Sequence, residues 1–417
     1  MSTYARGVAR LLSGTGLAAA LLLPTAVPAQ AAPAAGPPAA DGKGQELPGM
    51  PSALAADGDG PTCTPASKEK AKKQDWSRQR LDLDRLHGYS TGAGVTVALI
   101  DTGVVPDATG LDDRVTAQGA AAQDCVGHGT FLAGLIAGNG KGSARLTGVA
   151  PAAKILALRG TDTDGQPSTD LVVTAVRAAI AAKAEVIVVA VALPRRDAEL
   201  TRAVADAREA GALVVAAATP DPPRSGTDEI PARTYWPAGE PGVLSVADMM
   251  PAGVRPDSAL ATTGIDLVAP GAGVVSGGPR GDGHYLGAGA SVAAAYAAGA
   301  AAAVRAVRPD DSPDDVAHRL TATAYPADIP QLDAYAAVTT VLSGADGSAG
   351  GGRAAEPVAV RDSSEAERAT DRATLFVLVG SAGVLGVLWV AFALPRARAR
   401  GWRPAAAVPP AAAPDGD

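Results

Sequence analysis

The chain has 417 residues, a formal net charge of −7 and 47% hydrophobic residues, and its sequence pI is about 5.2. Apart from arginines near the C-terminus the sequence carries no basic stripe, so nothing in it indicates a nucleic-acid partner. The length allows one domain with a sizeable core in addition to terminal segments.

The first part of the chain has the three-part layout of a secretory signal peptide over residues 1–31. Arg6 and Arg10 precede an apolar stretch that Pro24 ends, and Ala29-Gln30-Ala31 follows as a small-x-small cleavage site. A buried core helix would explain the apolar stretch too, but an Ala/Pro-rich tract follows at once. We therefore expect export, with residues 32–75 as an N-terminal extension that is disordered to about Pro61.

From Trp76 to residue 342 apolar β-type runs alternate with helical patterns, after a short amphipathic segment around Leu83. Such alternation predicts an α/β domain with a mostly parallel sheet covered on both faces, and a ligand site at the carboxyl ends of its strands. The predicted strands are Val95–Ile100, Lys154–Leu158, Val186–Ala192, Leu213–Ala217 and Val243–Ala247. The predicted helices are Thr130–Ala137, Asp170–Ala182, Ala198–Ala210, Ser291–Val307 and Pro313–Thr323.

Two cysteines, Cys63 and Cys125, both fall on the exported side of the chain. In an oxidising compartment an even pair is most simply one disulfide. It would close a loop of about sixty residues and stabilise the fold by roughly 4 kcal/mol in the loop-entropy model. Two free thiols are the alternative.

Residues 343–372 are rich in Gly, Ser, Ala and mixed charge, which predicts a flexible linker. Residues 373–394 contain no charged residue and would rise roughly 33 Å as a helix, enough to cross a bilayer core of about 30 Å. Arginines such as Arg396 follow directly, and such flanks stay cytoplasmic. A core helix is the alternative, but we expect a single-pass membrane anchor, a cytoplasmic tail over residues 395–417 and the α/β domain outside the cell.

Three short motifs supply the residue types of a serine-protease triad. Asp101 ends an apolar run in Ile100-Asp101-Thr102-Gly103, His128 lies between glycines in Gly127-His128-Gly129-Thr130, and Ser291 opens an Ala-rich helical pattern. A serine hydroxyl needs a base to remove its proton, and the base needs an orienting carboxylate. We therefore predict Asp101, His128 and Ser291 as catalytic, since the order Asp, His, Ser along the chain is one of the few known solutions.

Each motif taken alone is weak evidence for a catalytic site. The aspartate could cap a turn, and a serine at a helix start is more often an N-cap than a nucleophile. An aspartic-protease site needs two carboxylates, but the chain has one Asp-Thr-Gly triplet. The serine lacks the Gly-x-Ser-x-Gly elbow, and no clustered His/Cys spacing indicates zinc. Asp162 and Asp164 could bind calcium, although a solvated loop is the simpler interpretation; no metal or cofactor is expected.

These motifs resemble those of the subtilisin-like serine proteases. That family has a strand ending in Asp-Ser/Thr-Gly, then Gly-His-Gly-Thr, then Gly-Thr-Ser-Met-Ala-Xaa-Pro; this chain matches the first two closely and has Gly289-Ala290-Ser291-Val292 at the third. Further likeness lies in Gly148–Leu158, Trp236-Pro237-Ala238 and Ala269-Pro270-Gly271. The resemblance covers roughly residues 75 to 340 and implies a subtilisin-like three-layer fold that hydrolyses peptide bonds in protein or peptide substrates.

The cysteine-containing extension, the signal peptide and the C-terminal helix with its arginine flank resemble the mycosins. Mycosins are membrane-anchored proteases associated with actinobacterial type VII secretion systems. The resemblance implies cleavage of a few secreted substrates, contact with secretion-channel subunits and a role in stabilising the channel.

One departure from the family concerns the oxyanion hole. The family carries Ala-Ala-Gly-Asn after its fourth strand, and the asparagine side chain is an oxyanion donor; here Thr219-Pro220-Asp221 follows the strand, with Pro220 at the expected position. Asp221 as an anion would repel an oxyanion. In subtilisin the loss of one such donor lowers turnover by about 10²–10³. We therefore expect a slow serine endopeptidase, and keep as the alternative a protease-like scaffold of a secretion complex.

Overall fold

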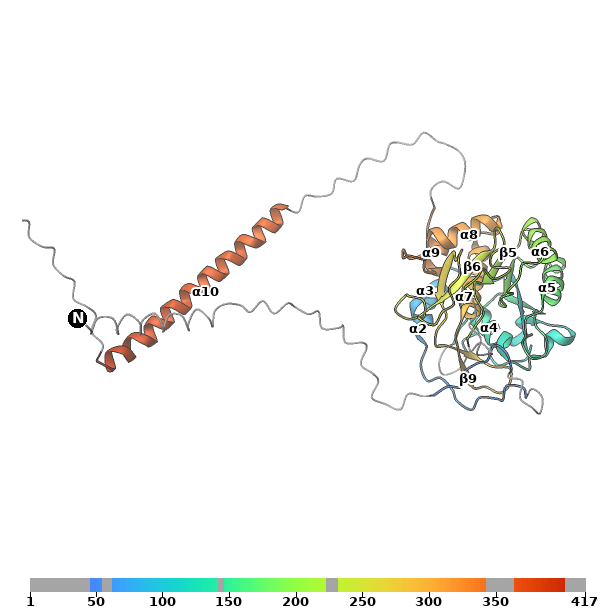
Figure 1. Ribbon diagram of the computed structural model, residues 1–417, viewed down its shortest axis with the longest axis horizontal. Helices are drawn as coiled ribbons and strands as arrows, with labels where there is room; N and C mark the ends of the chain where they lie inside the picture. The colour runs from blue at the N-terminus through green and yellow to red at the C-terminus, as the bar shows by residue number, and fades with distance from the viewer. Residues whose placement is uncertain (1–45, 55–61, 142–145, 223–231, 343–363, 402–417) are drawn as a thin grey trace, which may run out of the picture. The chain divides into compact units, whose positions relative to one another are not determined.

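The computed structural model describes residues 46–54, 62–141, 146–222, 232–342 and 364–401 (Figure 1). The chain divides into two compact units, Met1–Ala345 and Asp346–Asp417. The predicted signal peptide, residues 1–31, lies outside the described residues.

The first unit is built on a seven-stranded sheet in which all neighbouring strands are parallel, in the order β2-β3-β1-β4-β5-β6-β7. This confirms the predicted α/β fold with a mostly parallel sheet. The strands are β1 (Thr96–Asp101), β2 (Val115–Thr116), β3 (Lys154–Arg159), β4 (Val186–Val189), β5 (Leu213–Ala217), β6 (Leu244–Met249) and β7 (Leu267–Pro270).

Helices cover both faces of this sheet and make three layers (Figure 1). Alternate strand residues point to opposite faces, so Ile100 packs with α5 and α6, whereas Leu99 packs with the helices of the other face. The helices and 3₁₀ turns are α2 (Trp76–Arg80), α3 (Leu83–Leu86), η1 (Asp112–Arg114), η2 (Gly119–Ala122), α4 (His128–Ala137), α5 (Thr169–Ala181), α6 (Ala198–Glu209), α7 (Ala290–Val307), α8 (Pro313–Ala322) and α9 (Ala334–Thr339).

Helix α7 is the central helix of the domain and is almost wholly buried. Its small side chains let neighbouring segments approach closely: a Cβ atom at Gly299 would lie 2.7 Å from Cβ of Val149. An alanine-rich sequence therefore suits this position, because bulkier residues would force the sheet and α4 apart.

Strand β4 ends at Val189, not at Ala192 as its apolar run predicts. The amide of Ala190 still donates to the carbonyl of Ile100 at 3.1 Å. The neighbouring strand β1 ends one residue later, at Asp101, so the following residues of the run pass beyond the end of the ladder. The apolar run therefore predicts that these residues are buried, but it does not predict where the partner strand ends.

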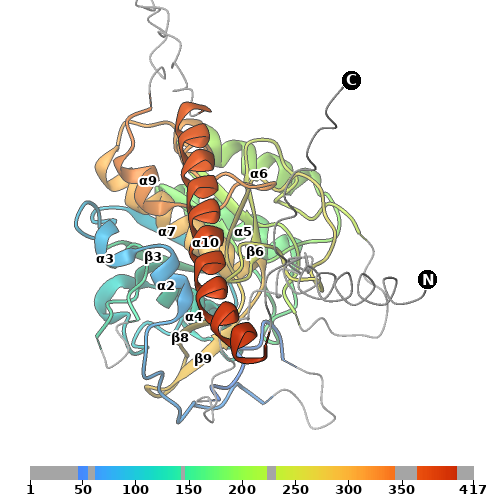
Figure 2. The ribbon, with the colours of Figure 1, turned by 90° about the vertical axis from the view of Figure 1, so that its left-hand side faces the viewer.

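A two-stranded antiparallel hairpin, β8 (Val274–Gly277) with β9 (His284–Gly287), lies beside α4 (Figure 2). The hydroxyl of Ser276 in β8 donates to the carbonyl of Phe131 in α4 at 2.9 Å. This hairpin was not predicted from the sequence.

Part of the N-terminal extension lies along the domain, which corrects the prediction of disorder as far as Pro61. In residues 46–54 the amide of Met50 donates to Leu286 in β9, and the amide of Leu54 donates to Asp164, both at 2.7 Å. Backbone hydrogen bonds of this kind do not depend on side-chain composition, so a Pro- and Ala-rich sequence does not reveal them. Farther along, Cys63 and Cys125 form the predicted disulfide.

The second unit contains the helix α10 (Ser364–Ala399). The predicted flexible linker ran to residue 372, but the helix already begins at Ser364, because residues 364–372 are mostly Glu, Ala and Arg, which are good helix formers. Residues 343–363 lie outside the described part. Two described helices are long and apolar enough to cross a membrane, α7 and the segment Phe376–Ala399 of α10; α7 is a buried core helix of the first unit.

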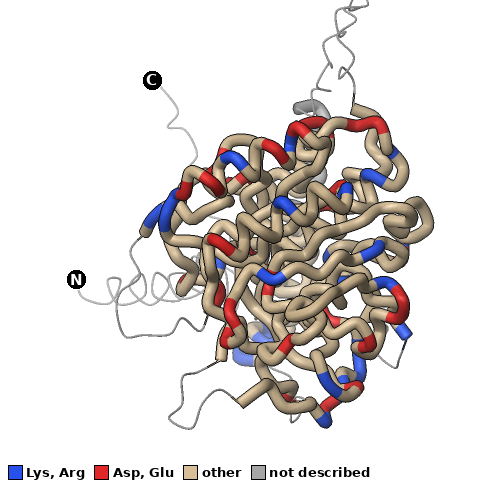
Figure 3. The backbone as a smooth tube through the Cα atoms, turned by 90° about the vertical axis from the view of Figure 1, so that its right-hand side faces the viewer, with Lys and Arg blue, Asp and Glu red and all other residues tan. Residues whose placement is uncertain are grey.

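Charged residues of both signs are interspersed over the face of the domain shown in Figure 3. Exposed ion pairs of the domain include Arg177 with Glu199 at 2.6 Å and Lys141 with Asp112 at 2.8 Å. Exposed pairs of this type contribute about 0–1 kcal/mol each. On that face neither sign of charge forms a continuous stripe.

Candidate active site

The three residues predicted as catalytic meet in the first unit. Asp101 is the last residue of β1, His128 the first of α4, and Ser291 the second of α7. Both carboxylate oxygens of Asp101 lie 3.0 Å from Nδ1 of His128, and Oγ of Ser291 lies 3.2 Å from Nε2 of the same ring. The contacts form one chain from carboxylate through imidazole to hydroxyl, which is the arrangement that lets a histidine take the proton of a serine.

The start of α4 holds His128 in place through a buried carboxylate, Asp124. One oxygen of Asp124 accepts from the amide of Gly127 at 2.6 Å, and the other accepts from the amide and hydroxyl of Thr130 at 2.9 and 2.6 Å. These bonds satisfy amides that have no partner within the helix. Gly127 has φ +92°, which disfavours residues with a Cβ atom. Burial raises the pKa of Asp124, and hydrogen bonds from Thr130 and Gly127 oppose that shift.

Thr102 links the loop after β1 to the start of α4. Its hydroxyl lies 3.0 Å from Oδ1 of Asp101 and 2.9 Å from Oδ1 of Asp124, and it accepts from the amide of Gly129 at 2.9 Å. A side chain on Gly129 would overlap the carbonyl of Gly103, so this close approach requires glycine. The motifs Asp-Thr-Gly and Gly-His-Gly-Thr are therefore two sides of one packed contact.

His128 is 5% exposed, and its ring lies between the carboxylates of Asp101 and Asp221. Burial disfavours its charged form, but Asp101 and Asp221 outweigh burial and hold the pKa of His128 well above its ordinary value. Oδ2 of Asp221 lies 3.3 Å from Nε2 of the ring, the same nitrogen that faces Ser291.

In the segment after β5 the residue that faces Ser291 is Asp221. The sequence comparison had predicted Pro220 at that place, so the prediction was wrong by one residue. The backbone amide of Ser291 donates to Oδ1 of Asp221 at 3.0 Å, and its hydroxyl donates to Oδ2. The side chain of Asp221 is 5% exposed, and Ser291 is fully buried. The carboxylate of Asp221 therefore lies against the amide of Ser291, in the place where the family has an asparagine side chain that donates to the oxyanion.

A cavity of about 190 Å³ opens beside Asp221 and the N-terminus of α7. Its lining is mostly apolar, and Asp248 is its buried carboxylate. Burial raises the pKa of Asp248, Arg255 opposes that shift from 3.7 Å, and the charge of Asp221 adds to it. Further lining residues are Thr219, Pro222, Met250, Leu260, Ala272 and Ala290.

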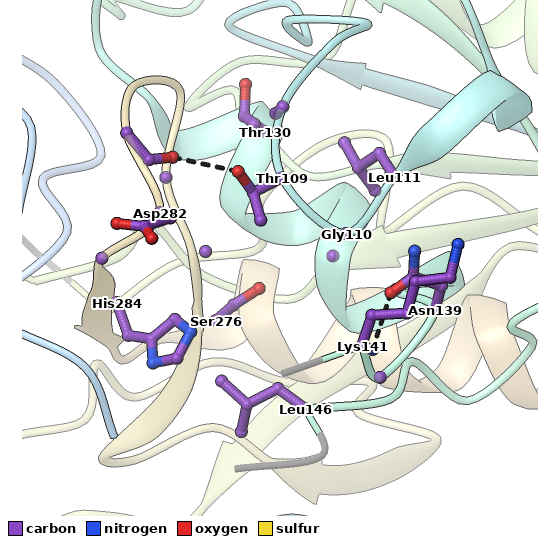
Figure 4. A pocket seen from close by; sticks show the side chains of 18 residues that line it. Thr109, Gly110, Leu111, Thr130, Asn139, Lys141, Leu146, Ser276, Asp282 and His284 are labelled. Carbon is purple, nitrogen blue, oxygen red and sulfur yellow. Dashed lines mark hydrogen bonds between the residues drawn. The ribbon is translucent and has the colours of Figure 1, made fainter. Parts of the chain in front are cut away.

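A second hollow lies between the loop after β1, the end of α4 and the hairpin β8–β9 (Figure 4). The hydroxyl of Thr109 donates to the carbonyl of Gly281 at 3.2 Å on one side, and the amide of Lys141 donates to Asn139 at 2.8 Å on the other. None of the three candidate catalytic residues lines it.

Two of the remaining histidines make structural contacts. Nε2 of His87 lies 3.1 Å from the carbonyls of Gly148 and Val149, and Nδ1 of His284 accepts from the amide of Ala71 at 2.8 Å. The loop considered as a calcium site is a turn in which Asp162 accepts two backbone amides.

Asp124 and Thr102 are functional residues that were not predicted from the sequence. Asp124 lies three residues before Gly127, the N-cap residue of α4, so a search for a capping side chain at the helix start passes over it. Thr102 gave no signal either, because its contacts join segments that are far apart in the chain.

Residues 92–362 match the model of the subtilase family, Peptidase_S8. Mycosin-1 of Mycobacterium tuberculosis is 31% identical over 304 residues, which cover 60% of this chain and 68% of the relative. Mycosin-3 of the same species is 30% identical over 355 residues, covering 68% of this chain and 75% of the relative. Subtilisin E of Bacillus subtilis is 30% identical over 264 residues, covering 61% and 67%.

Solved structures of mycosins are similar in fold. The MycP3 protease from the type VII (ESX-3) secretion system superposes with a TM-score of 0.55 at 29% identity, covering 72% of this chain and 95% of that one. MycP1 with its N-terminal propeptide removed also gives 0.55 at 29% identity, covering 64% and 98%.

Proposed function

The chain belongs to the subtilase family of serine proteases, and on that premise we propose that it cleaves peptide bonds with Ser291 as nucleophile, His128 as base and Asp101 as orienting carboxylate. The observation that carries the proposal is the unbroken chain of contacts from Asp101 to His128 at 3.0 Å and from His128 to Ser291 at 3.2 Å. Three segments far apart in the sequence build it at the end of a parallel strand.

In the proposed reaction Oγ of Ser291 attacks the scissile carbonyl carbon while its proton passes to Nε2 of His128. Asp101 holds the ring with Nδ1 protonated and stabilises the imidazolium that forms. The C–N bond then breaks, and the leaving amine takes the proton from His128. Water next attacks the acyl carbon while its proton passes to His128, the bond to Oγ of Ser291 breaks, and Ser291 takes that proton back. The N-terminus of α7 favours the negative charge that develops beside Ser291.

The cavity beside Asp221 supports a preference for substrates with an apolar side chain next to the scissile bond. Ala290, the residue before the reacting serine, lines it, and Met250 and Leu260 contribute to its apolar lining. Such a pocket gains about 25 cal/mol for each Å² of apolar surface that it removes from water.

We further propose that the protease acts outside the cell, anchored in the membrane and associated with a type VII secretion system. The likeness to mycosin-1 and mycosin-3 supports the association, and the apolar end of α10, Phe376–Ala399, supports the anchor. The proposed domains are a signal peptide (1–31), an extension (32–75), a peptidase domain (76–342), a linker (343–372) that is helical from Ser364, a transmembrane helix (373–394) and a cytoplasmic tail (395–417).

A second candidate function is that of a scaffold in the secretion complex whose peptidase site is silent. The observation in its favour is the carboxylate of Asp221, which binds the amide and hydroxyl of a fully buried Ser291. An enzyme needs that hydroxyl accessible to substrate, whereas a scaffold does not.

A comparison of secretion in cells distinguishes the two candidates. Cells that carry Ser291→Ala in place of the natural chain are compared with cells that lack the whole protein, and proteolysis of secreted proteins is followed in both. Loss of cleavage in the Ser291→Ala cells supports the protease. Normal processing in those cells, with a defect only in the deletion, would contradict it and support the scaffold.

A further inference from the structure

Asp221 occupies the part of the site that a substrate oxyanion would need. Its Oδ1 accepts the amide of Ser291 at 3.0 Å, and its Oδ2 accepts the hydroxyl of the same residue. The backbone amide of the nucleophile is a typical oxyanion donor in this chemistry. A carboxylate on that amide and a substrate oxyanion on the same amide would place two negative charges in one small site.

The position of Asp221 is enforced by packing. Its side chain is 5% exposed, and a Cβ atom on Gly289 would overlap its carboxylate. Gly289 has φ +130° and is the N-cap residue of α7, so the carboxylate lies at the positive end of that helix. The same end of the helix would stabilise an oxyanion, so carboxylate and oxyanion compete for one favourable place.

The groups that face Asp221 come from three elements. His128 in α4 lies 3.3 Å from Oδ2, with Asp101 on the far side of the ring. Asp248 in β6 interacts with it electrostatically, and Arg255 lies 3.7 Å from Asp248. The third element is the N-terminus of α7. Of these titratable groups, His128 is the one that contacts Asp221 directly, so a single proton can lie on either side chain of the pair.

We propose that Asp221 is the second oxyanion donor of this protease in its carboxylic-acid form, and that its ionised form holds the site closed. The reacting form is then the one in which the His128–Asp221 pair carries one proton and that proton is on Asp221. His128 is neutral in this form and can act as base, and the acid O–H of Asp221 can donate to the oxyanion. This inference rests on the proposed function and adds to it the residue that limits the rate.

The proton count predicts the pH dependence of the reaction. With two protons on the pair, His128 is charged and cannot act as base. With none, Asp221 is an anion and excludes the oxyanion. With one proton, the form that carries it on His128 is unreactive, so only a fraction of the protein reacts at any pH. The natural chain should therefore show slow activity that declines on both the acid and the alkaline side.

Asp221→Asn tests the inference, because asparagine keeps the size of the side chain, removes its charge and supplies an N–H donor. The full-length chain is purified in detergent, and its rate of labelling by a fluorophosphonate probe is measured between pH 5 and pH 10. In that reaction the Oγ–P bond forms, the P–F bond breaks, the proton goes to His128 and fluoride leaves. Hydrolysis of fluorescent casein is followed in parallel.

Asp221→Asn should react about 10²–10³-fold faster than the natural chain at pH 9, because one oxyanion donor typically raises the rate by this factor. Its alkaline decline should disappear and its acid limb should move to lower pH, because the anion no longer stabilises the charged ring of His128. Asp221→Ala is the matched control: it removes the charge without supplying a donor. It should lose the alkaline decline as well, but react about 10²–10³-fold more slowly than Asp221→Asn.

Equal rates for the natural chain and Asp221→Asn, with the same alkaline decline in both, would overturn the inference while leaving the protease proposal intact. Equal rates for Asp221→Asn and Asp221→Ala would overturn the donor role. Ser291→Ala, introduced beside each of these variants, must abolish labelling. If labelling persists there, or if no variant reacts at any pH, the proposed function falls together with the inference.

Discussion

Asp101 faces His128 with both oxygens of its carboxylate, each 3.0 Å from Nδ1 of the ring. The pair is buried, with side-chain exposures of 2% for Asp101 and 6% for His128. The contact fixes which ring nitrogen carries the proton and leaves Nε2 to face Ser291.

Asp101→Asn should keep the fold and lower kcat by about 10⁴, because an amide that donates to Nδ1 would hold the ring in the wrong tautomer. KM should change little, since Asp101 does not face the substrate cavity. Steady-state hydrolysis of casein at several pH values checks this. A loss of less than tenfold would show that Asp101 does not orient the base.

Arg78 and Asp75 form a buried ion pair at 3.0 Å at the start of α2. Arg78 also donates to the carbonyls of Thr147 and Val275, both at 2.8 Å, and Asp75 accepts from the amide of Val275 at 2.7 Å. Arg78→Ala should lower the free energy of unfolding by about 3–5 kcal/mol, because it leaves a buried carboxylate without its charged partner.

The exposed pair of Arg177 and Glu199 supplies the control for that experiment. Arg177→Ala should cost no more than about 1 kcal/mol, as expected for a solvated ion pair. Urea unfolding of the two variants and the natural chain gives both numbers. Similar losses in the two variants would show that burial of the Arg78 pair makes no difference.

The disulfide between Cys63 and Cys125 joins residues separated by 62 positions. Replacing both cysteines by serine should lower the free energy of unfolding by about 4 kcal/mol in the loop-entropy model. Dithiothreitol should destabilise the natural chain by a similar amount and leave the double variant unchanged. A reducing agent that destabilises both proteins equally would show that the bridge is not the cause.

Membrane attachment by the apolar end of α10 can be tested by truncation. A chain that stops at residue 342 ends before this helix and contains every element of the first unit that the structure describes. It should be recovered in the soluble fraction, whereas the full chain should remain with the membrane after a high-salt wash, because a span of this length is held by burial of apolar surface and not by charge. Membrane retention of the truncated chain would contradict the anchor.

The architecture could be predicted from the sequence because its strands and helices carry strong local patterns. Residues 97–100, just before Asp101, are continuously apolar, and most residues of α7 are alanine, so the pattern of apolar residues predicts the strand and the composition predicts the helix. The hairpin β8–β9 escaped prediction since its strands are four residues each and lie among glycines. The ordered part of the extension escaped because its hydrogen bonds are made by backbone groups of distant segments.

In the candidate site, too, some residues could be predicted from the sequence and one could not. Asp101, His128 and Ser291 each lie in a short motif that the sequence displays, and the structure brings the three side chains into contact. The residue that faces Ser291 was predicted one position away, at Pro220. A shift of one residue depends on the path of the backbone after β5, and a linear motif comparison does not contain that path. The direction of a single side chain is therefore the least predictable feature of such a site.

The most direct test of the account is labelling of the full-length chain with a fluorophosphonate probe, followed by mass spectrometry of the labelled peptide. The account predicts slow labelling at a single residue, Ser291, that disappears in Ser291→Ala and in His128→Ala while both variants stay folded. Labelling that persists without Ser291, or a folded natural chain that takes up no probe at any pH, would contradict it.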